Sequence, residues 1–373
     1  MKVYILTLPL GQNYGGTLQN YALQQVVKRL GHSPQTLLYR NRHNFGYYFH
    51  DVMRHVKHYW KYRDVPLKSE IHKRQLPLRQ FVAANIVTTL EFDSVHELKD
   101  FMAQENGIAV IVGSDQVWRP CYAGKRLDAY FLDFLRNRRD IRRISYAASF
   151  GTDQWEYKDK HASLAKGLIQ EFDAVSIRES SAVQLCSKYL DYNKAEWVPD
   201  PVLLLSAEDY RALYSHDSPY PIAPHSLAVY LLDALDHKML LAEEVAKRRE
   251  NWLHTLIPDI TKKNGLTDYL PLEEWLASID QADAVITDSF HGTVLSIIFH
   301  KQFVVLSNAK RGLSRLHEIL GRFGLEGRLL DENATPTQVL EVLEHPINYQ
   351  QVEERMPSIR AIGYDFLKRN LCQ

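Results

Sequence analysis

Residues 284–299 combine a buried apolar run with polar side chains that could carry out acid–base chemistry. The run is rich in Ala, Val and Ile, breaks at Asp288 and Ser289, and resumes after Gly292, which predicts a strand, a tight turn and a helix. Ligands of open α/β sheets bind beyond the carboxyl ends of strands, and the free N–H groups of a new helix favour an anion there. His291, in this turn, could carry or release a proton because the reference pKa of histidine is about 6.5. The alternative is a helix-capping turn whose histidine only packs.

Two other charged residues follow predicted strands. Arg178 comes after the apolar run 172–177, and its planar guanidinium can bind a carboxylate or phosphate through two hydrogen bonds. The alternative is an ion pair with Glu179 or another acid at the surface. Asp115 follows the apolar run 108–112, where a carboxylate could act as a base or accept a hydrogen bond from a sugar hydroxyl. It could equally stabilise the turn that follows.

Three cations follow the next predicted strand, residues 303–307. They are Lys310, Arg311 and Arg315. In a parallel sheet these side chains would lie beside the His291 turn, an arrangement that suits a small, multiply charged anion. A basic loop that faces solvent is the alternative.

Motifs for other chemistry are absent from the sequence. It has no G-x-x-x-x-G-K-[ST] phosphate loop, no H-E-x-x-H pair, no G-x-S-x-G elbow and no paired C-x-x-C. The glycine turn at residues 11–16 does not match G-x-G-x-x-G, and no acid ends the strand at residues 32–39, which argues against a nicotinamide dehydrogenase. The histidines outside residues 40–79 do not cluster at metal-ligand spacing. We therefore expect neither a metal nor a cofactor.

Strands and helices that alternate along the chain must position these residues. The apolar runs that we predict as strands are 2–8, 32–39, 108–112, 143–148, 172–177, 196–198, 226–232, 252–257, 284–287, 303–307 and 329–330, and the first is followed by a predicted helix at 17–30. Strands that end in small or polar residues at a turn are typical of a parallel sheet with a ligand crevice. The pattern predicts an α/β fold of two doubly wound lobes with a cleft between them.

The domain boundaries follow from a proline-rich stretch without periodicity at residues 215–225. We place the first lobe at residues 1–210, a linker at 211–225, the second lobe at 226–345 and a C-terminal helical segment at 346–373.

Residues 40–79 differ from the rest of the chain. They hold ten Lys/Arg, five His and only three acids, interleaved with aromatic residues. We predict one or two basic, aromatic helices inserted into the first lobe at about residues 40–80. Such a surface could meet an anionic membrane face or a lipid diphosphate. A solvated helix with some aromatic residues turned inward is an equal alternative.

The composition is that of a globular protein without a dominant charge. The 373 residues include 45 Lys/Arg and 45 Asp/Glu, so no overall field attracts nucleic acid. Three isolated cysteines suit a reducing compartment. The first ten residues resemble a strand rather than a signal peptide, and no apolar run reaches the ~18 residues of a membrane span. We expect a cytoplasmic protein that could work at the inner face of the membrane.

Short motifs along roughly residues 1–320 resemble, in the same order, those of the polysaccharide pyruvyl transferase family. They are Asn13–Gln19, Val112–Gln116, Tyr146–Gly151, Ser176–Glu179, Val198–Pro201 and Thr287–Gly292. Each motif is short, and the ordered set is far more specific than any one of them. The resemblance implies a GT-B-like fold of two Rossmann-like lobes with no metal requirement.

The resemblance also implies the activity. A member of this family would transfer the enolpyruvyl unit of phosphoenolpyruvate onto two hydroxyls of one sugar, giving a cyclic pyruvate ketal and phosphate. The second lobe would hold phosphoenolpyruvate, and the first lobe with its insert would hold the acceptor, a cell-surface polysaccharide precursor that we expect to be linked to a lipid diphosphate. The catalytic residues would be His291 and Asp115. The residues expected to bind substrate are Asn13, Tyr14, Gly15, Arg178, Ser289, Phe290, Gly292, Lys310, Arg311 and Arg315.

One position departs from the family pattern. Ser289 stands where the family carries an arginine that helps to bind phosphoenolpyruvate. We predict that Arg311 or Arg315 takes over this role. Two alternatives stay open from the sequence: a GT-B glycosyltransferase that uses a nucleotide sugar, and a binding module that has lost turnover.

Overall fold

The computed structural model describes residues 1–39, 45–57, 65–214, 223–233, 235–256, 268–308 and 312–372, and of residues 45–48 and 50 it describes only the backbone.

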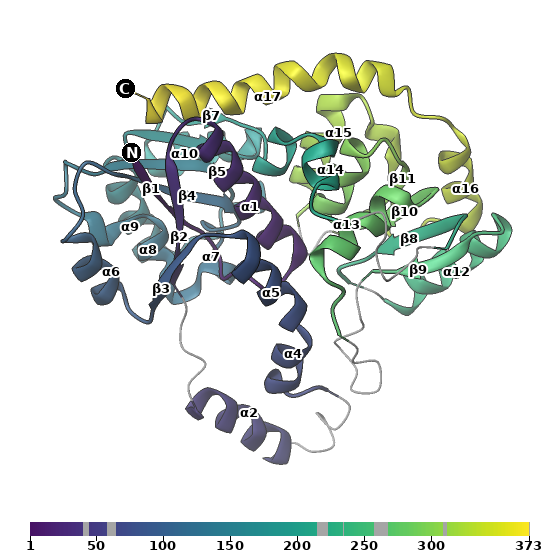
Figure 1. Ribbon diagram of the computed structural model, residues 1–373, viewed down its shortest axis with the longest axis horizontal. Coiled ribbons are helices and arrows are strands. Elements are labelled where there is room, and N and C mark those ends of the chain that lie inside the picture. The colour runs from purple at the N-terminus through teal and green to yellow at the C-terminus, as the bar shows by residue number, and fades with distance from the viewer. Residues whose placement is uncertain are drawn as a thin grey trace.

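A seven-stranded parallel sheet forms the centre of the first lobe, in the order β3-β2-β1-β4-β5-β6-β7 (Figure 1). Its strands are β1 (Lys2–Leu6), β2 (Ser33–Tyr39), β3 (Thr88–Phe92), β4 (Ala109–Asp115), β5 (Arg142–Ala148), β6 (Ala174–Ile177) and β7 (Glu196–Trp197). Helices cover both faces, so a central strand such as β4 is buried at every residue and its sequence is apolar without alternation. The strand order reverses between β1 and β4, which is where doubly wound sheets bind ligands.

A five-stranded parallel sheet forms the second lobe, in the order β12-β11-β10-β8-β9. Its strands are β8 (Ser226–Tyr230), β9 (Trp252–Thr255), β10 (Ala284–Thr287), β11 (Gln302–Leu306) and β12 (Leu329–Leu330). The strand order reverses between β8 and β10, both buried along their whole length. This sheet therefore offers a second switch point.

The helices cover the sheets, link the lobes and form one projection. Those of the first lobe are α1 (Tyr14–Arg29), α2 (Phe45–Lys57), α4 (Lys68–Arg74), α5 (Leu76–Asn85), α6 (Val95–Met102), α7 (Pro120–Ala123), α8 (Leu127–Tyr130), α9 (Asp159–Ile169), α10 (Ser180–Leu190) and α11 (Ala207–Arg211), with 3-10 turns at Gly124–Arg126, Asp133–Leu135 and Pro201–Leu204. Those that follow are α12 (Asp236–Arg248), α13 (Leu272–Gln281), α14 (Phe290–Ile298), α15 (Ser314–Phe323), α16 (Pro336–Glu344) and α17 (Tyr349–Leu371), with a 3-10 turn at Glu326–Arg328.

The predicted α/β fold with two doubly wound lobes is confirmed, and three local expectations are corrected. Strand β3 was not expected, because it is a short edge strand with only two of its five residues buried. Strand β4 continues to Asp115 instead of ending at residue 112. Helix α1 begins at Tyr14 rather than Thr17, because the side chain of Asn13 accepts a hydrogen bond from a backbone N–H of the first turn.

The predicted linker falls mostly outside the described part of the chain. Helix α11 ends at Arg211, and residues 215–222 are not described. The domain boundaries therefore stay predictions.

The two lobes share one hydrophobic cluster, which runs from β1 and α1 through α13 and α14 to α17. Tyr14 of α1 stacks on Trp275 of α13, with ring centroids 4.7 Å apart and an interplanar angle of 4°. Helix α17 crosses both lobes (Figure 1), and its Arg369 pairs with Glu196 of β7 at 2.8 Å. Within the described ranges, every helix is too short or too polar to span a bilayer.

Candidate active site

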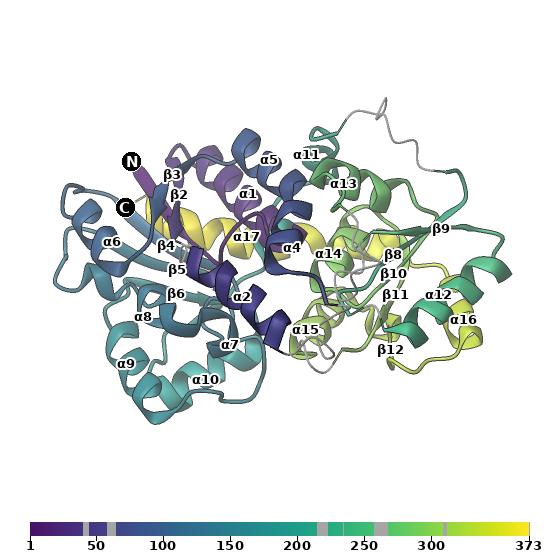
Figure 2. The same cartoon turned by 90° about the horizontal axis from the view of Figure 1, so that it is seen from below.

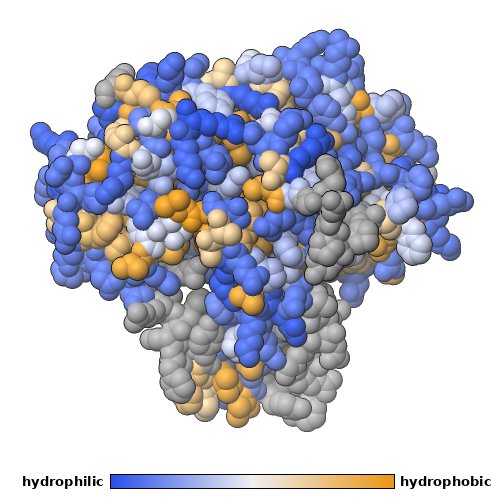
Figure 3. Space-filling view, viewed as in Figure 1, coloured by the Kyte–Doolittle hydropathy of each residue, from blue (hydrophilic) through white to orange (hydrophobic). Residues whose placement is uncertain are grey.

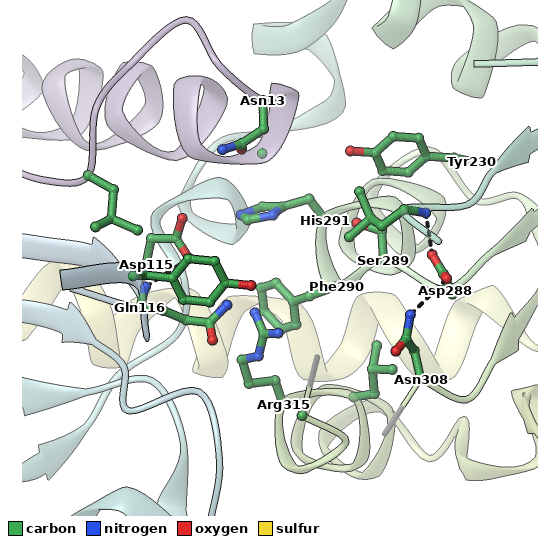
Figure 4. A pocket seen from close by; sticks show the side chains of 16 residues that line it. Asn13, Asp115, Gln116, Tyr230, Asp288, Ser289, Phe290, His291, Asn308 and Arg315 are labelled. Atoms are coloured by element: carbon green, nitrogen blue, oxygen red, sulfur yellow. Dashed lines mark hydrogen bonds between the residues drawn. The ribbon is translucent and has the colours of Figure 1, made fainter. Parts of the chain in front are cut away.

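A cavity of about 150 Å³ lies where the switch points of the two sheets face each other (Figure 4). Its lining comes from both lobes: Leu8, Asn13, Gly15, Asp115, Gln116, Tyr122, Tyr230, Leu232, Asp288, Ser289, Phe290, His291, Asn308, Gly312, Arg315 and Leu316. Pockets for drug-sized ligands usually measure roughly 300–1,000 Å³. The cavity therefore suits a small metabolite, and it gathers residues that the sequence singled out in both lobes.

Two capped helix N-termini meet at this cavity. Asn13 caps α1, and its Oδ1 accepts a hydrogen bond from the backbone N–H of Gly16 at 2.6 Å. Ser289 caps α14, and its Oγ accepts one from the backbone N–H of Gly292 at 3.4 Å. Both caps line the cavity. Because helix N-termini carry partial positive charge, their convergence favours an anion.

His291 enters the cavity from the first turn of α14 and points toward the first lobe (Figure 4). It is 7% exposed, and its Nε2 has no hydrogen-bond partner within the described structure. The nearest carboxylate oxygen is Oδ2 of Asp200, 3.8 Å from Nε2. Burial lowers the pKa of His291, while the negative charges of Asp200 and Asp115 partly oppose this shift. The imidazole is therefore neutral near pH 7 and able to accept a proton.

The imidazole of His291 lies directly against the start of α1. A Cβ added to Gly15 would lie 2.0 Å from Nδ1 of His291. Gly15 is thus required by close approach: only a residue without a side chain leaves space for this ring.

Arg178 is not among the residues that line the cavity but lies directly behind them, so its expected contact with the ligand stays a prediction. Its Nη1 donates to Asp200 Oδ2 at 2.8 Å, and its guanidinium lies 3.5 Å from Asp115 and from Glu179. Burial alone would lower the pKa of Arg178, but the three carboxylates raise it overall. The guanidinium also lies 4.8 Å from the ring centroid of Phe290, which lines the cavity. Arg178 therefore supports the residues that form the wall.

Asp200 is a site residue that our sequence analysis quoted in a motif but assigned no role. Its Oδ2 accepts hydrogen bonds from Arg178 and from Ser114 Oγ, the latter at 3.2 Å, and its Oδ1 accepts from the backbone N–H of Val202. Burial by itself raises the pKa of Asp200, but the imidazole of His291, whenever it is protonated, and the guanidinium of Arg178 lower it overall. An ionised carboxylate thus lies close to the imidazole of His291. The Asp200-Pro201 pair in the motif Val198–Pro201 could have indicated this residue.

Asp115 does line the cavity. Its Oδ1 accepts a hydrogen bond from the backbone N–H of Gln116 at 2.8 Å, as expected for a turn-stabilising aspartate. It also lies 3.5 Å from the guanidinium of Arg178. The two interpretations from the sequence are therefore compatible, because one carboxylate can hold the turn and still face a ligand.

Arg315 is the cation that the structure places at the cavity. It is 8% exposed, and its guanidinium carbon lies 5.8 Å from the ring centroid of Phe290. Burial, and secondarily the charge of Arg178, lowers the pKa of Arg315 to about 10, so it stays protonated at neutral pH. The other two cations of this segment, Lys310 and Arg311, lie outside the described residues.

Tyr14 and Gly292 do not line the cavity, although both were expected to bind substrate. The hydroxyl of Tyr14 donates to the backbone oxygen of Leu270, and its ring packs between the lobes. Gly292 provides the N–H that Ser289 caps. Both residues serve the scaffold of the site.

The second-lobe wall contains a network that our sequence analysis missed. Asp288 accepts hydrogen bonds from the backbone N–H of Leu232 at 2.6 Å, from Asn308 at 3.0 Å and from the fully buried Lys238 at 3.4 Å. These bonds tie the ends of β8 and β11 to the turn before α14, and so fix the position of His291.

In the part of the chain described, no group of three or more His, Cys, Asp or Glu side chains could hold a metal ion, and a metal-free site stays an expectation.

A close backbone contact joins the lobes at the rim of the cavity. Gly312, with φ of +87°, lies so near the first lobe that an added Cβ would meet the backbone oxygen of Gly151 at 1.9 Å.

Comparisons with known proteins agree with this architecture. A protein-family model described as polysaccharide pyruvyl transferase matches residues 13–310. A search of curated proteins finds no match to the chain. Among solved structures, the UDP-GlcNAc 2-epimerase from Neisseria meningitidis bound to UDP-GlcNAc superposes with a TM-score of 0.56 at 11% identity, covering 100% of both chains. UGT89C1 from Arabidopsis thaliana complexed with UDP-L-rhamnose gives a TM-score of 0.55 at 10% identity, covering 100% of this chain and 99% of that one. At such identities the likeness establishes only the two-lobed, GT-B-like fold.

Proposed function

Because the chain belongs to the polysaccharide pyruvyl transferase family, we propose that it transfers the enolpyruvyl unit of phosphoenolpyruvate onto two hydroxyls of one sugar in a cell-surface polysaccharide precursor. The products are a cyclic pyruvate ketal and inorganic phosphate. Membership of this family makes the protein a pyruvyl transferase. What we propose beyond this is the donor, the ketal product and the class of acceptor.

The observation that carries the proposal is the meeting of two helix N-termini, Arg315 and a neutral His291 at one small cavity. A carboxylate and a phosphate both gain from backbone N–H groups and a guanidinium. Arg315 is the described residue that fits the role of the arginine replaced by Ser289. It approaches the cavity from α15 instead of from the turn before α14.

The reaction needs proton transfers that these side chains can serve. The first sugar hydroxyl adds across the enol: its oxygen bonds to C2 of the enolpyruvyl unit, and a proton bonds to C3, which becomes a methyl group. The second hydroxyl then bonds to C2 as the C2–O bond to phosphate breaks, and its proton leaves with phosphate or solvent. His291 accepts a hydroxyl proton and, once protonated, can donate one. Asp200 stabilises the imidazolium that forms, as a buried carboxylate does beside a histidine base.

The first-lobe wall suits the acceptor. Asp115 and Gln116 provide polar side chains that can accept or donate hydrogen bonds to sugar hydroxyls, and the ring of Tyr122 offers an apolar face. The carboxylate of Asp115 would repel a dianion, whereas that of Asp288 on the opposite wall is paired with the fully buried Lys238. We therefore place the donor toward Arg315 and the caps, and the acceptor toward Asp115.

A thermal-shift panel with the full chain tests this proposal. A ligand at 100 times its Kd stabilises the folded state by about 2.7 kcal/mol, so phosphoenolpyruvate should raise the melting temperature. Uridine and guanosine diphosphates serve as the comparison, because a nucleotide-sugar enzyme would bind them. Stabilisation by a nucleoside diphosphate and not by phosphoenolpyruvate would overturn the proposal.

A further inference from the structure

Helix α2 projects from the body of the molecule (Figure 1), and it carries an apolar stripe along one face. Phe49, Val52, Met53 and Val56 follow the i, i+3, i+4, i+7 spacing of one helix face. Their exposed fractions are 54%, 42%, 47% and 65%. Figure 3 shows hydrophobic side chains gathered at the tip of this projection. A surface helix normally turns such a stripe toward the core, and here the stripe faces outward.

The polar face of α2 holds the helix in this orientation. Asp51, 2% exposed, accepts hydrogen bonds from Arg54 at 2.6 Å and from the backbone N–H of Lys68 at 2.8 Å. The ring of His55 bonds to the backbone oxygen of Val65 at 3.1 Å. Residues 65–68 therefore bind the polar face, and within the described part of the chain Val52, Met53 and Val56 stay exposed.

Positive charge accompanies the stripe. Residues 40–79 carry ten Lys/Arg against three acids, although the whole chain balances 45 against 45. Two of those acids are engaged inside the insert, since Asp51 binds Arg54 and Glu70 accepts from the backbone N–H of Leu67. Lys57 and Lys73 are exposed on α2 and α4. An apolar stripe flanked by cations is the pattern of a helix that lies in the interface of an anionic bilayer.

The projection is attached beside the mouth of the active site. The side chain of Gln75 donates to the backbone oxygen of Gln12, the residue before the α1 cap that lines the cavity. Arg74 pairs with Asp268 of the second lobe at 3.0 Å. Figure 2, seen from below, shows α4 in front of the junction of the lobes and α2 in front of the adjoining part of the first lobe.

We propose that α2 docks the enzyme on the face of an anionic lipid bilayer, with Val52, Met53 and Val56 in the interface and Lys57 and Lys73 against lipid headgroups. Charge segregation favours a bilayer over a second copy of this chain, because two copies would bring like charges together. Docking would place the cavity next to an acceptor sugar carried on a lipid diphosphate. That consequence rests on the proposed function, whereas docking itself does not.

Flotation with lipid vesicles tests the docking. The full chain should bind vesicles of phosphatidylglycerol and phosphatidylcholine and should not bind phosphatidylcholine alone. Replacing Val52, Met53 and Val56 together by Ser should weaken binding by about tenfold or more. The double variant Lys57→Glu/Lys73→Glu should weaken it by about tenfold as well.

A matched triple variant controls for loss of exposed apolar surface. Leu90, Leu240 and Ile362, with exposed fractions of 87%, 64% and 40%, lie away from the projection, and their replacement by Ser should leave vesicle binding unchanged. Both triple variants should keep the melting temperature and the response to phosphoenolpyruvate, which separates this test from that of the proposed function. Absence of binding by the unaltered chain, equal binding by the α2 variant, or a dimer in solution that the α2 variant abolishes would each overturn the proposal.

Discussion

His291 owes its chemistry to its surroundings rather than to its place in the sequence. Burial keeps the imidazole neutral, Gly15 leaves it space, and Asp200 lies 3.8 Å from Nε2. A general base contributes about 10²–10⁴-fold to a rate. We predict that His291→Ala lowers turnover by that factor, measured as phosphate release from phosphoenolpyruvate with an acceptor sugar. His96→Ala, a change at an exposed histidine, should leave turnover normal. Near-normal turnover by His291→Ala would reject the assignment of His291 as the general base.

The pH dependence of kcat/KM reports the same imidazole in the free enzyme. A base must be neutral to act, so activity is lost as the pH falls through its pKa. Because burial lowers that pKa, the acid limb should lie below about 6.5. The charge of Asp200 raises the pKa of His291, so Asp200→Asn should move the limb to still lower pH. Glu196→Gln, at a surface ion pair, should leave it in place, and an acid limb above about pH 7 would contradict the assignment.

Gly15 offers a test of position instead of chemistry. In Gly15→Ala the new Cβ would overlap the ring of His291, so the ring must move. We predict a large loss of kcat with a folded protein, judged by circular dichroism and melting temperature. Gly167→Ala is the matched control, because nothing lies within 4 Å of its added Cβ and the helix should gain up to about 1 kcal/mol. Equal activity of the two variants would show that the close approach of Gly15 to the ring of His291 does not affect catalysis.

At the scale of elements, α15 of the second lobe fastens the start of α10 in the first. Glu318 accepts hydrogen bonds from the backbone N–H and the hydroxyl of Ser180, both at 3.0 Å, and pairs with Arg322 at 2.8 Å. Arg322 in turn lies 3.6 Å from the ring centroid of Trp197. These contacts hold the lobes in the arrangement that lets Arg315, on the same helix, reach the cavity.

We predict that Glu318→Ala lowers the free energy of unfolding by about 1–3 kcal/mol, because it removes a helix cap and leaves the N–H of Ser180 without its partner. It should also raise the KM for phosphoenolpyruvate. Glu244→Ala is the matched control: Glu244 and Arg248 form the same i, i+4 pair within α12 alone, worth about 0.3–0.5 kcal/mol. Equal effects of the two substitutions on stability and KM would contradict a role for Glu318 between the lobes.

At the scale of the whole molecule, local sequence patterns were sufficient for the fold. Buried parallel strands appear as continuous apolar runs, and those of both lobes were recognised. The edge strand β3 was missed because a half-exposed strand lacks such a run.

The candidate site was predictable where it depends on a strand end and its turn. Asn13, Asp115, Ser289 and His291 follow strands, and they line one cavity. Contacts between distant segments were not predictable from local spacing. Three carboxylates surround Arg178 and hold it behind the residues that line the cavity. Tyr14 stacks on Trp275, which comes from the other lobe.

A crystal structure of the protein grown with phosphoenolpyruvate tests the central claim most directly. We predict that phosphoenolpyruvate lies in the cavity between the starts of α1 and α14. One of its oxygens should lie within about 3.2 Å of the guanidinium of Arg315, and its methylene carbon should face His291. Phosphoenolpyruvate bound elsewhere, with this cavity filled only by solvent, would contradict it.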